Sequence, residues 1–137
     1  MTEAILTFAE QQSLSGTSAQ LSTNVYDAGK AVKFFEGNGG GELEIEVTAA
    51  GGTSPTFQAQ LVGADNAALS TNPIVIADTG TSPALAAGDL PVLYRLHPNN
   101  QVTAKEFYGV KFTQGGTSPT ATVNARIGQA AQNNMVK

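Results

Sequence analysis

Cysteine and tryptophan are absent from this 137-residue chain, and histidine occurs once. Without cysteine the chain has no disulfides, thiolate zinc sites, iron–sulfur clusters or cysteine nucleophile. A single histidine argues against a histidine-rich metal site and against a histidine-based catalytic relay. We therefore expect a protein that uses neither a metal nor a cofactor.

Charged residues are also scarce, at 13% of the chain, and they leave a net charge of −4. Seven basic residues against eleven acidic ones, with no basic cluster, argue against a nucleic-acid partner. No run approaches the roughly 18 apolar residues of a membrane span, so we expect no membrane partner. No basic segment followed by an apolar stretch opens the chain, which argues against a cleaved secretory signal.

Small and polar residues dominate instead, because glycine, threonine, serine, asparagine, glutamine and proline occupy 62 positions. The apolar fraction is 41%, but 20 of those residues are alanine, so 36 larger side chains must build the core. This composition is typical of a β protein. The length suits a single domain over residues 1–137.

Four segments alternate apolar and polar residues with period two, which predicts strands with one buried face. They are Glu42–Val47, Thr56–Leu61, Phe107–Phe112 and Ala121–Ile127. Weaker patterns at Ala4–Phe8, Thr23–Tyr26, Ala31–Phe35, Pro73–Ala77 and Pro91–Leu96 bring the expected total to about nine short strands. We predict an all-β, antiparallel two-sheet sandwich, with a jelly roll favoured over an immunoglobulin-like arrangement. Residues 1–21 and 130–137 are expected to form loosely structured N-terminal and C-terminal arms.

One hexapeptide occurs twice, as Gly51-Gly52-Thr53-Ser54-Pro55-Thr56 and as Gly115-Gly116-Thr117-Ser118-Pro119-Thr120, and Gly80–Pro83 is a shorter copy. Glycine pairs supply positive φ angles, and proline does not continue a central ladder. Each long copy is therefore interpreted as a hairpin loop between two alternating strands. The alternative, a Gly-Thr-Ser-Pro recognition motif, is less favoured because turn chemistry suffices.

The outward positions of the strand Glu42–Val47 are all acidic: Glu42, Glu44 and Glu46. Carboxylates two residues apart on a strand lie roughly 7 Å apart, a spacing at which paired acids act on glycosidic bonds. The favoured interpretation is nevertheless a solvated strand face, with contact to a cation or a basic partner as the second choice.

Three basic residues, Arg95, Lys111 and Arg126, fall on the outer faces of expected strands. They are the best candidates for ion pairs, either with the glutamate stripe or with an acidic partner. Such pairs contribute little stability when exposed.

Two further constellations have ordinary structural interpretations. Asp65, Asp78 and Asp89 lie near asparagines in expected loops, where Asx turns and solvation are favoured over calcium binding. His97 follows a strand, and no Gly-x-Ser-x-Gly elbow accompanies it. The sequence thus contains no catalytic constellation, and we expect a protein that is not an enzyme.

The order of several short segments resembles the small capsid cement proteins of tailed bacteriophages, the group typified by the Bordetella phage cement protein. The matching segments are Ser22–Gly29, the glycine-rich Gly37–Gly41, Leu43–Val47, the Gly51–Thr53 loop, Phe57–Leu61, Leu93–Leu96 with His97-Pro98-Asn99, Phe107–Phe112, Gly115–Thr117 and the last strand, Ala121–Ile127. Each match is short and of low complexity, so the resemblance lies in their order along the chain. The acidic stripe and the third Gly-Thr-Ser-Pro copy are not assigned to the family pattern.

The resemblance implies a jelly-roll decoration protein on the outer capsid surface of the virion, made in the host bacterial cytoplasm. It would bind the major capsid protein, join neighbouring capsid subunits and stabilise the shell against DNA pressure. The resemblance also implies an oligomer; a homotrimer is slightly favoured, and a dimer is the other choice at symmetric positions. The alternative from another class is a carbohydrate-binding or receptor-binding module of a phage fibre.

Candidate contacts with the capsid or another partner come from three places in the sequence. The expected N-terminal arm supplies the apolar anchors Ile5, Leu6 and Phe8, although these residues also suit a first strand. The acidic stripe supplies Glu42, Glu44 and Glu46, and the outer strand faces supply Arg95 and Arg126.

Overall fold

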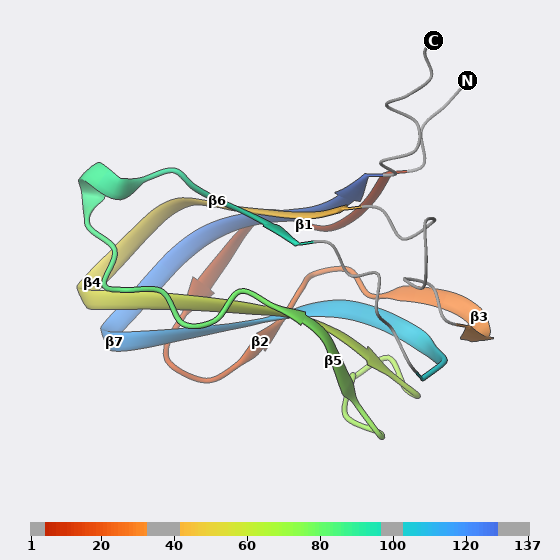
Figure 1. Ribbon diagram of the computed structural model, residues 1–137. Coiled ribbons are helices and arrows are strands. Elements are labelled where there is room, and N and C mark those ends of the chain that lie inside the picture. The colour runs from red at the N-terminus through yellow and green to blue at the C-terminus, as the bar shows by residue number, and fades with distance from the viewer. Residues whose placement is uncertain (1–4, 33–41, 97–102, 129–137) are drawn as a thin grey trace, which may run out of the picture.

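The structure is a computed structural model that describes residues 5–32, 42–96 and 103–128, and these form an antiparallel β protein (Figure 1). The strands are β1 (Ile5–Ser15), β2 (Gln20–Leu21), β3 (Tyr26–Val32), β4 (Glu42–Ala64), β5 (Ile74–Asp78), β6 (Val92–Leu96) and β7 (Lys105–Gly128). A short 3₁₀ helix, η2 (Ala87–Asp89), precedes β6. The all-β fold predicted from the sequence is confirmed. Within the described ranges, no helix is long and apolar enough to cross a membrane.

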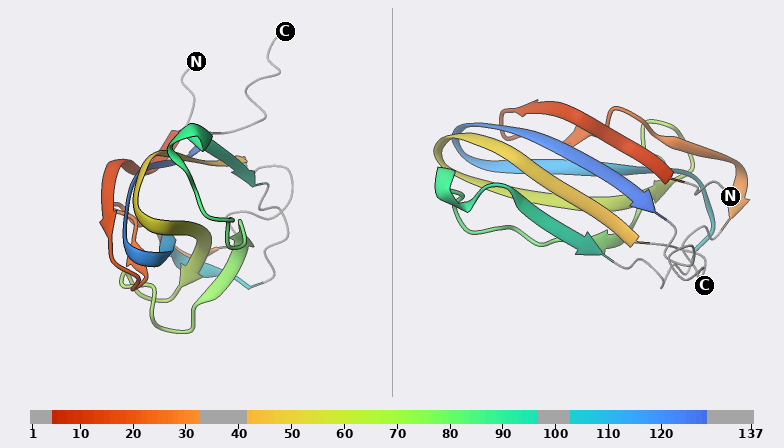
Figure 2. Two further views of the ribbon diagram at one scale, coloured as in Figure 1. Left: turned by 90° about the vertical axis from the view of Figure 1, so that its left-hand side faces the viewer. Right: turned by 90° about the horizontal axis from the view of Figure 1, so that it is seen from above.

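Two long strands, β4 with 23 residues and β7 with 24, organise the fold. They pair with each other from Glu42 opposite Gly128 to Ala64 opposite Phe107. Both strands bend in the middle and turn back, so each runs through both layers of the molecule (Figures 1 and 2). The seven strands therefore form one hydrogen-bonded sheet folded over on itself.

Each layer has β4 and β7 at its centre and shorter strands at its edges. The first layer has the order β1, β7, β4, β6, and the second has β2 and β3, then β7, β4, β5. This arrangement agrees with a two-layer antiparallel sandwich, and the jelly-roll topology stays a prediction.

The core fills the space between the two layers. Its fully buried aromatic members include Phe57 of β4 and Phe112 of β7, whose ring centroids lie 6.0 Å apart. Tyr94 of β6 stacks on Phe57 at 5.9 Å and so holds the edge strand of the first layer against the second. Aromatic pairs at such distances add to the free energy gained from burying their area.

The repeated hexapeptides lie opposite each other at the bend of β4 and β7. Gly51 pairs with Thr120, and Thr53 pairs with Thr117, with register shifts on both sides of the second pair. The prediction of two hairpin loops is therefore wrong: each copy bends one continuous strand, and four predicted short strands are two long ones. Positive-φ glycines and proline also suit bulges and bends within strands, which explains the misinterpretation.

The backbones of the two copies approach each other closely and reciprocally. Gly52 has a φ of +96°, and a Cβ there would lie 2.5 Å from the carbonyl oxygen of Ser118. Gly116 has a φ of +106°, and a Cβ there would lie 2.6 Å from the carbonyl oxygen of Ser54. Only glycine satisfies both the left-handed conformation and this contact.

The third, shorter copy covers the free edge of β4 beside the bend. Ser82 N–H donates to the carbonyl of Phe57 at 2.9 Å, and Leu85 N–H donates to that of Pro55 at 2.7 Å. Ser82 also accepts a hydrogen bond through Oγ from Phe57 N–H at 3.0 Å. The segment therefore satisfies main-chain groups of β4 that lie beyond the end of β5.

Most of the expected N-terminal arm is an integral strand, so the prediction of a loose arm over residues 1–21 is wrong for β1 and β2. β1 pairs with β7 from Ile5 opposite Gly128 to Ser15 opposite Thr120. Phe8 is 0% exposed within the core. The alternation is hidden in the sequence because Phe8 and Ala9 are both buried and the register shifts on both sides of Ala9. Residues 130–137 lie outside the described residues.

Replacing Gly52 or Gly116 by alanine should destabilise the protein. The left-handed conformation alone costs an alanine about 1–2 kcal/mol, and the Cβ would also collide with the opposite backbone. We expect the midpoint of thermal unfolding to fall by several degrees. Gly88→Ala is the matched control, since no atom lies within 4 Å of its Cβ position and its φ is not positive. Equal midpoints for Gly52→Ala and Gly88→Ala would contradict the close approach.

Candidate interaction face

The outer surface of the first layer carries four of the charged residues singled out in the sequence: Glu44, Glu46, Arg95 and Arg126. Seen from above, β1, β7, β4 and β6 lie side by side across it (Figure 2). One cross-strand row contains Arg95 of β6, Glu44 of β4 and Arg126 of β7. The next row contains Leu93, Glu46 and Asn124. We call the surface formed by these two rows the charged face.

Glu44 joins three strands through its carboxylate. Arg126 donates from Nη2 to Oε1 at 2.8 Å, and Arg95 Nε lies 3.4 Å from Oε2. The arginine side chains remain 54% and 56% exposed, whereas that of Glu44 is 24% exposed. Exposed ion pairs contribute only about 0–1 kcal/mol each. Their main effect here is to hold two guanidinium groups beside one carboxylate.

Glu46 and Asn124 connect β4 with the irregular part of β1. Asn124 Nδ2 donates to Glu46 Oε1 at 3.3 Å, and Asn124 Oδ1 accepts from Gln11 N–H at 2.7 Å. Gln11 has a φ of +51°, which marks the bulge in β1. A shallow hollow of about 300 Å³ lies beside this bulge, lined by Thr7, Ala9, Glu10, Gln11, Asn124 and Arg126.

The structure brings together five of the eight candidate contact residues. Glu44, Glu46, Arg95 and Arg126 lie on the charged face, and Glu42 is a half-buried residue at the start of β4 in the same alternation. The prediction that the arginines pair with the glutamate stripe is confirmed for Glu44. Lys111, the third basic candidate, lies in the second layer opposite Gln60.

The three apolar candidates lie in β1 and not in an arm. Phe8 is buried in the core, so its assignment as a capsid anchor is wrong. The backbone of Ile5 pairs with Gly128 and that of Leu6 with Ile127. The alternative interpretation of this segment as a first strand is the correct one.

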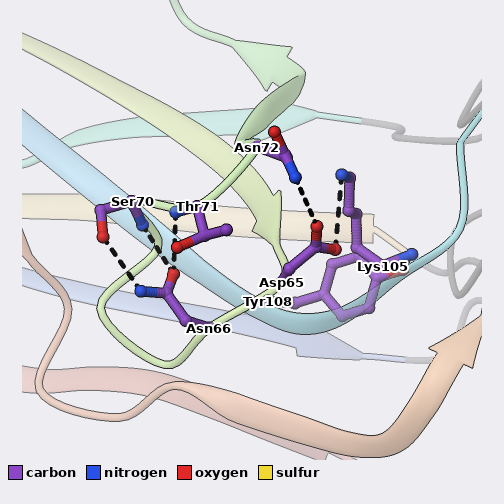
Figure 3. Close-up of polar contacts among 7 residues, drawn as sticks. All are labelled: Asp65, Asn66, Ser70, Thr71, Asn72, Lys105 and Tyr108. Carbon is purple, nitrogen blue, oxygen red and sulfur yellow. Dashed lines mark hydrogen bonds and ion pairs between the residues drawn. The ribbon is translucent and has the colours of Figure 1, made fainter.

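A second polar cluster lies where β4 ends and the chain crosses to β5 (Figure 3). Lys105 is a buried lysine with a 7% exposed side chain, and its Nζ lies 3.5 Å from Asp65 Oδ1. Asn72 donates to the other carboxylate oxygen of Asp65 at 3.0 Å. The hydrogen bond from Asn72 is the largest influence on the pKa of Asp65 and lowers it; desolvation opposes this shift, and the charge and hydrogen bond of Lys105 add to it.

Sequence reasoning missed Lys105, because a lysine at the start of a strand is usually solvated. The loop of this cluster is closed by Asn66, whose Oδ1 accepts from the N–H groups of Ser70 and Thr71 at 2.9 Å each. This contact satisfies the loop's own backbone, in keeping with a structural interpretation of these aspartates and asparagines.

Two other aspartates form the turns expected of them. Asp78 Oδ1 accepts from Gly80 N–H at 2.7 Å, and Asp27 Oδ1 accepts from Gly29 N–H at 2.8 Å. Both contacts are Asx turns, and the one at Asp78 was predicted from the sequence. In the part of the chain that the structure describes, no three acidic or histidine side chains gather as a metal site would require. His97 lies outside the described residues.

The acidic pair Asp27 and Glu106 lies near Asp65. A hydrogen bond to Asp27, followed by desolvation and the charges of Asp27 and Asp65, raises the pKa of Glu106. The pKa values of Glu106 and Asp65 are therefore shifted in opposite directions, although both residues are carboxylic acids.

The fold and the charged face together define a small all-β sandwich whose outer sheet face is polar and ion-paired. No protein-family model matches the chain, and no curated protein matches it.

Asp65→Asn should reduce stability at neutral pH and have little effect in acid. Because the folded-state pKa of Asp65 is lowered, its contribution is present above the unfolded-state pKa and is lost as pH falls through the folded-state value. Thermal unfolding of the wild type and the variant at pH 7 and pH 3 checks this. The exposed Glu10, replaced by glutamine, serves as control. A gap between wild type and Asp65→Asn that stays constant with pH would contradict the lowered pKa of Asp65 and the contacts with Asn72 and Lys105 that lower it.

Proposed function

We propose that this chain is a structural virion protein that binds the outside of an icosahedral phage capsid. In this role it joins neighbouring major capsid subunits and stabilises the shell against the pressure of packaged DNA. The proposal combines the segment order that resembles phage cement proteins with the character of the charged face.

The single observation that carries the proposal is the Glu44 hub of the charged face. Glu44 pairs with Arg95 of β6 on one side and with Arg126 of β7 on the other, so both guanidinium groups lie beside its carboxylate. More than half of each arginine side chain remains exposed. Arginine presents its donors in a planar fork that suits carboxylates and carbonyls of a protein partner. A preorganised face of this kind binds with little loss of side-chain freedom.

The contacts of the stripe favour binding over acid–base chemistry. Each oxygen of Glu44 has an arginine partner, and Glu46 accepts from Asn124. The glycosidase alternative for Glu42, Glu44 and Glu46 therefore gains no support from the geometry.

A capsid-bound role also suits the thin core. Binding to the folded state alone stabilises it by mass action. A protein with few large apolar side chains thus gains stability from the shell that it decorates.

Reversing the charge of Arg95 and Arg126 together should weaken capsid binding. We expect the double variant Arg95→Glu with Arg126→Glu to lose at least about tenfold in affinity, or about 1.4 kcal/mol. The reversed charges would meet acceptors of the partner and repel them. The measurement is cosedimentation with DNA-filled capsids assembled without this protein, titrated at fixed salt.

Lys111→Glu is the matched control, since it reverses one charge on the other layer and should bind like the wild type. Circular dichroism and thermal unfolding establish that each variant is folded. Undiminished binding by the folded double variant would refute the assignment of the face. Failure of the wild type to bind capsids, with specific binding to a glycan in isolation, would favour the fibre-module alternative.

A further inference from the structure

A second, smaller apolar cluster lies on the outer face of the second layer, under the loop that joins β4 to β5. Val62 and Ala64 alternate along β4 with Leu61 of the main core, so they point away from that core. Leu69 of the loop is 1% exposed and belongs to the same cluster. Three partly buried side chains complete it: Leu21, Val25 and Phe107. We call the loop segment Asp65–Asn72 the strap.

Leu69 lies over a glycine of β7 that leaves room for it. A Cβ at Gly109 would lie 2.8 Å from Leu69 Cδ1 and 3.3 Å from Val25 Cγ2. Leu69 has a φ of +56°, a backbone conformation that is unfavourable for a side chain of this size. Asn72, at the other end of the strap, is also left-handed, with a φ of +47°. The buried contact of Leu69 therefore holds the strap in a strained conformation.

The strap is also attached through an ion pair with a buried lysine of β7 (Figure 3). Lys105 Nζ lies 3.5 Å from Asp65 Oδ1, and Asn72 Nδ2 donates to Asp65 Oδ2 at 3.0 Å. The Lys105 side chain is 7% exposed, whereas that of Asp65 is 42% exposed, so solvent reaches the carboxylate more easily than the ammonium group. Neutralising Asp65 would leave this buried ammonium group without its counter-charge.

The other titratable groups around Asp65 come from β3 and β7. Asp27 of β3 is hydrogen-bonded to Glu106 of β7, and the Tyr108 hydroxyl accepts from the Lys105 N–H at 3.3 Å. The pKa of Glu106 is raised and that of Asp65 is lowered, so Glu106 takes up a proton before Asp65 as the pH falls. Loss of the Glu106 charge removes a repulsion from Asp65. The ion pair with Lys105 therefore persists until Asp65 itself is protonated.

We propose that the strap is released by acid while the sandwich stays folded. Protonation of Asp65 removes the counter-charge of Lys105, and the strained backbone then favours withdrawal of Leu69 from its position over Gly109. The outer face of β4 becomes accessible at Ala64, whereas the main core is unaffected because it lies on the opposite face of the same strand. Because the pKa of Asp65 is lowered in the folded state, the attachment is present above its unfolded-state pKa and is lost as pH falls through the folded-state value.

Thiol labelling at two matched positions separates strap release from global unfolding, because the native chain has no cysteine. Ala64 and Ala59 are both 0% exposed residues of β4, one in the cluster under the strap and the other in the main core. The probe is a pyridyl disulfide, which reacts with accessible thiols in acid as well as at neutral pH. From pH 7 to pH 3, we expect the labelling rate of Ala64→Cys to rise at least about tenfold relative to that of Ala59→Cys.

The variant Asp65→Asn, added to Ala64→Cys, tests the assigned trigger. Labelling should already be at least about fivefold faster at pH 7 than in Ala64→Cys alone, and it should change little with pH. Glu10→Gln in the same background is the control and should leave the pH profile unchanged, since Glu10 is an exposed residue of β1. Circular dichroism establishes that each variant is folded.

Three outcomes would overturn the proposal: equal acceleration of Ala64→Cys and Ala59→Cys in acid, labelling of Ala64→Cys that does not depend on pH, or a pH profile that Asp65→Asn leaves unchanged. The strap lies on the second layer, the charged face lies on the first, and the measurements use the isolated chain. Their outcome is therefore independent of the proposed function.

Discussion

The antiparallel pairing of β4 with β7 is the constraint on which the rest of the structure depends. Both long strands must bend at the same level, or their ladder would break between the layers. The two Gly-Gly-Thr-Ser-Pro-Thr copies meet this need, because Gly52 and Gly116 each let the opposite backbone approach to a distance that excludes a Cβ atom. The bend thus lies where two identical segments face each other across the ladder.

This central pair also determines where polar and open surfaces lie. The first half of β4 and the second half of β7 place Glu44 and Arg126 in one cross-strand row, and β6 adds Arg95 from the other side. The same row ends at β6, an edge strand of the first layer. The face proposed to bind the capsid is therefore built on the central strand pair and one edge strand.

Period-two alternation correctly predicted which residues of β4 and β7 point inward, because that pattern depends only on one buried face. It also placed Glu44 and Arg126 on outer faces. The hairpin interpretation was wrong because glycine and proline chemistry is the same in a chain reversal and in a bent strand. A chain reversal and a bent strand are distinguished only by what the segment pairs with, and here each hexapeptide copy pairs with the other copy, 64 positions away in the sequence. β1 was missed as an integral strand because its bulge interrupts the alternation around Ala9. Lys105 was missed because nothing in the sequence around it indicated that its side chain is buried.

Nuclear Overhauser contacts between the two hexapeptide copies test the central pairing most directly. The structure predicts cross-strand backbone contacts between Thr53 and Thr117 and between Gly51 and Thr120. Contacts that instead join Val47 to Phe57, as a hairpin around the first copy would require, would contradict it.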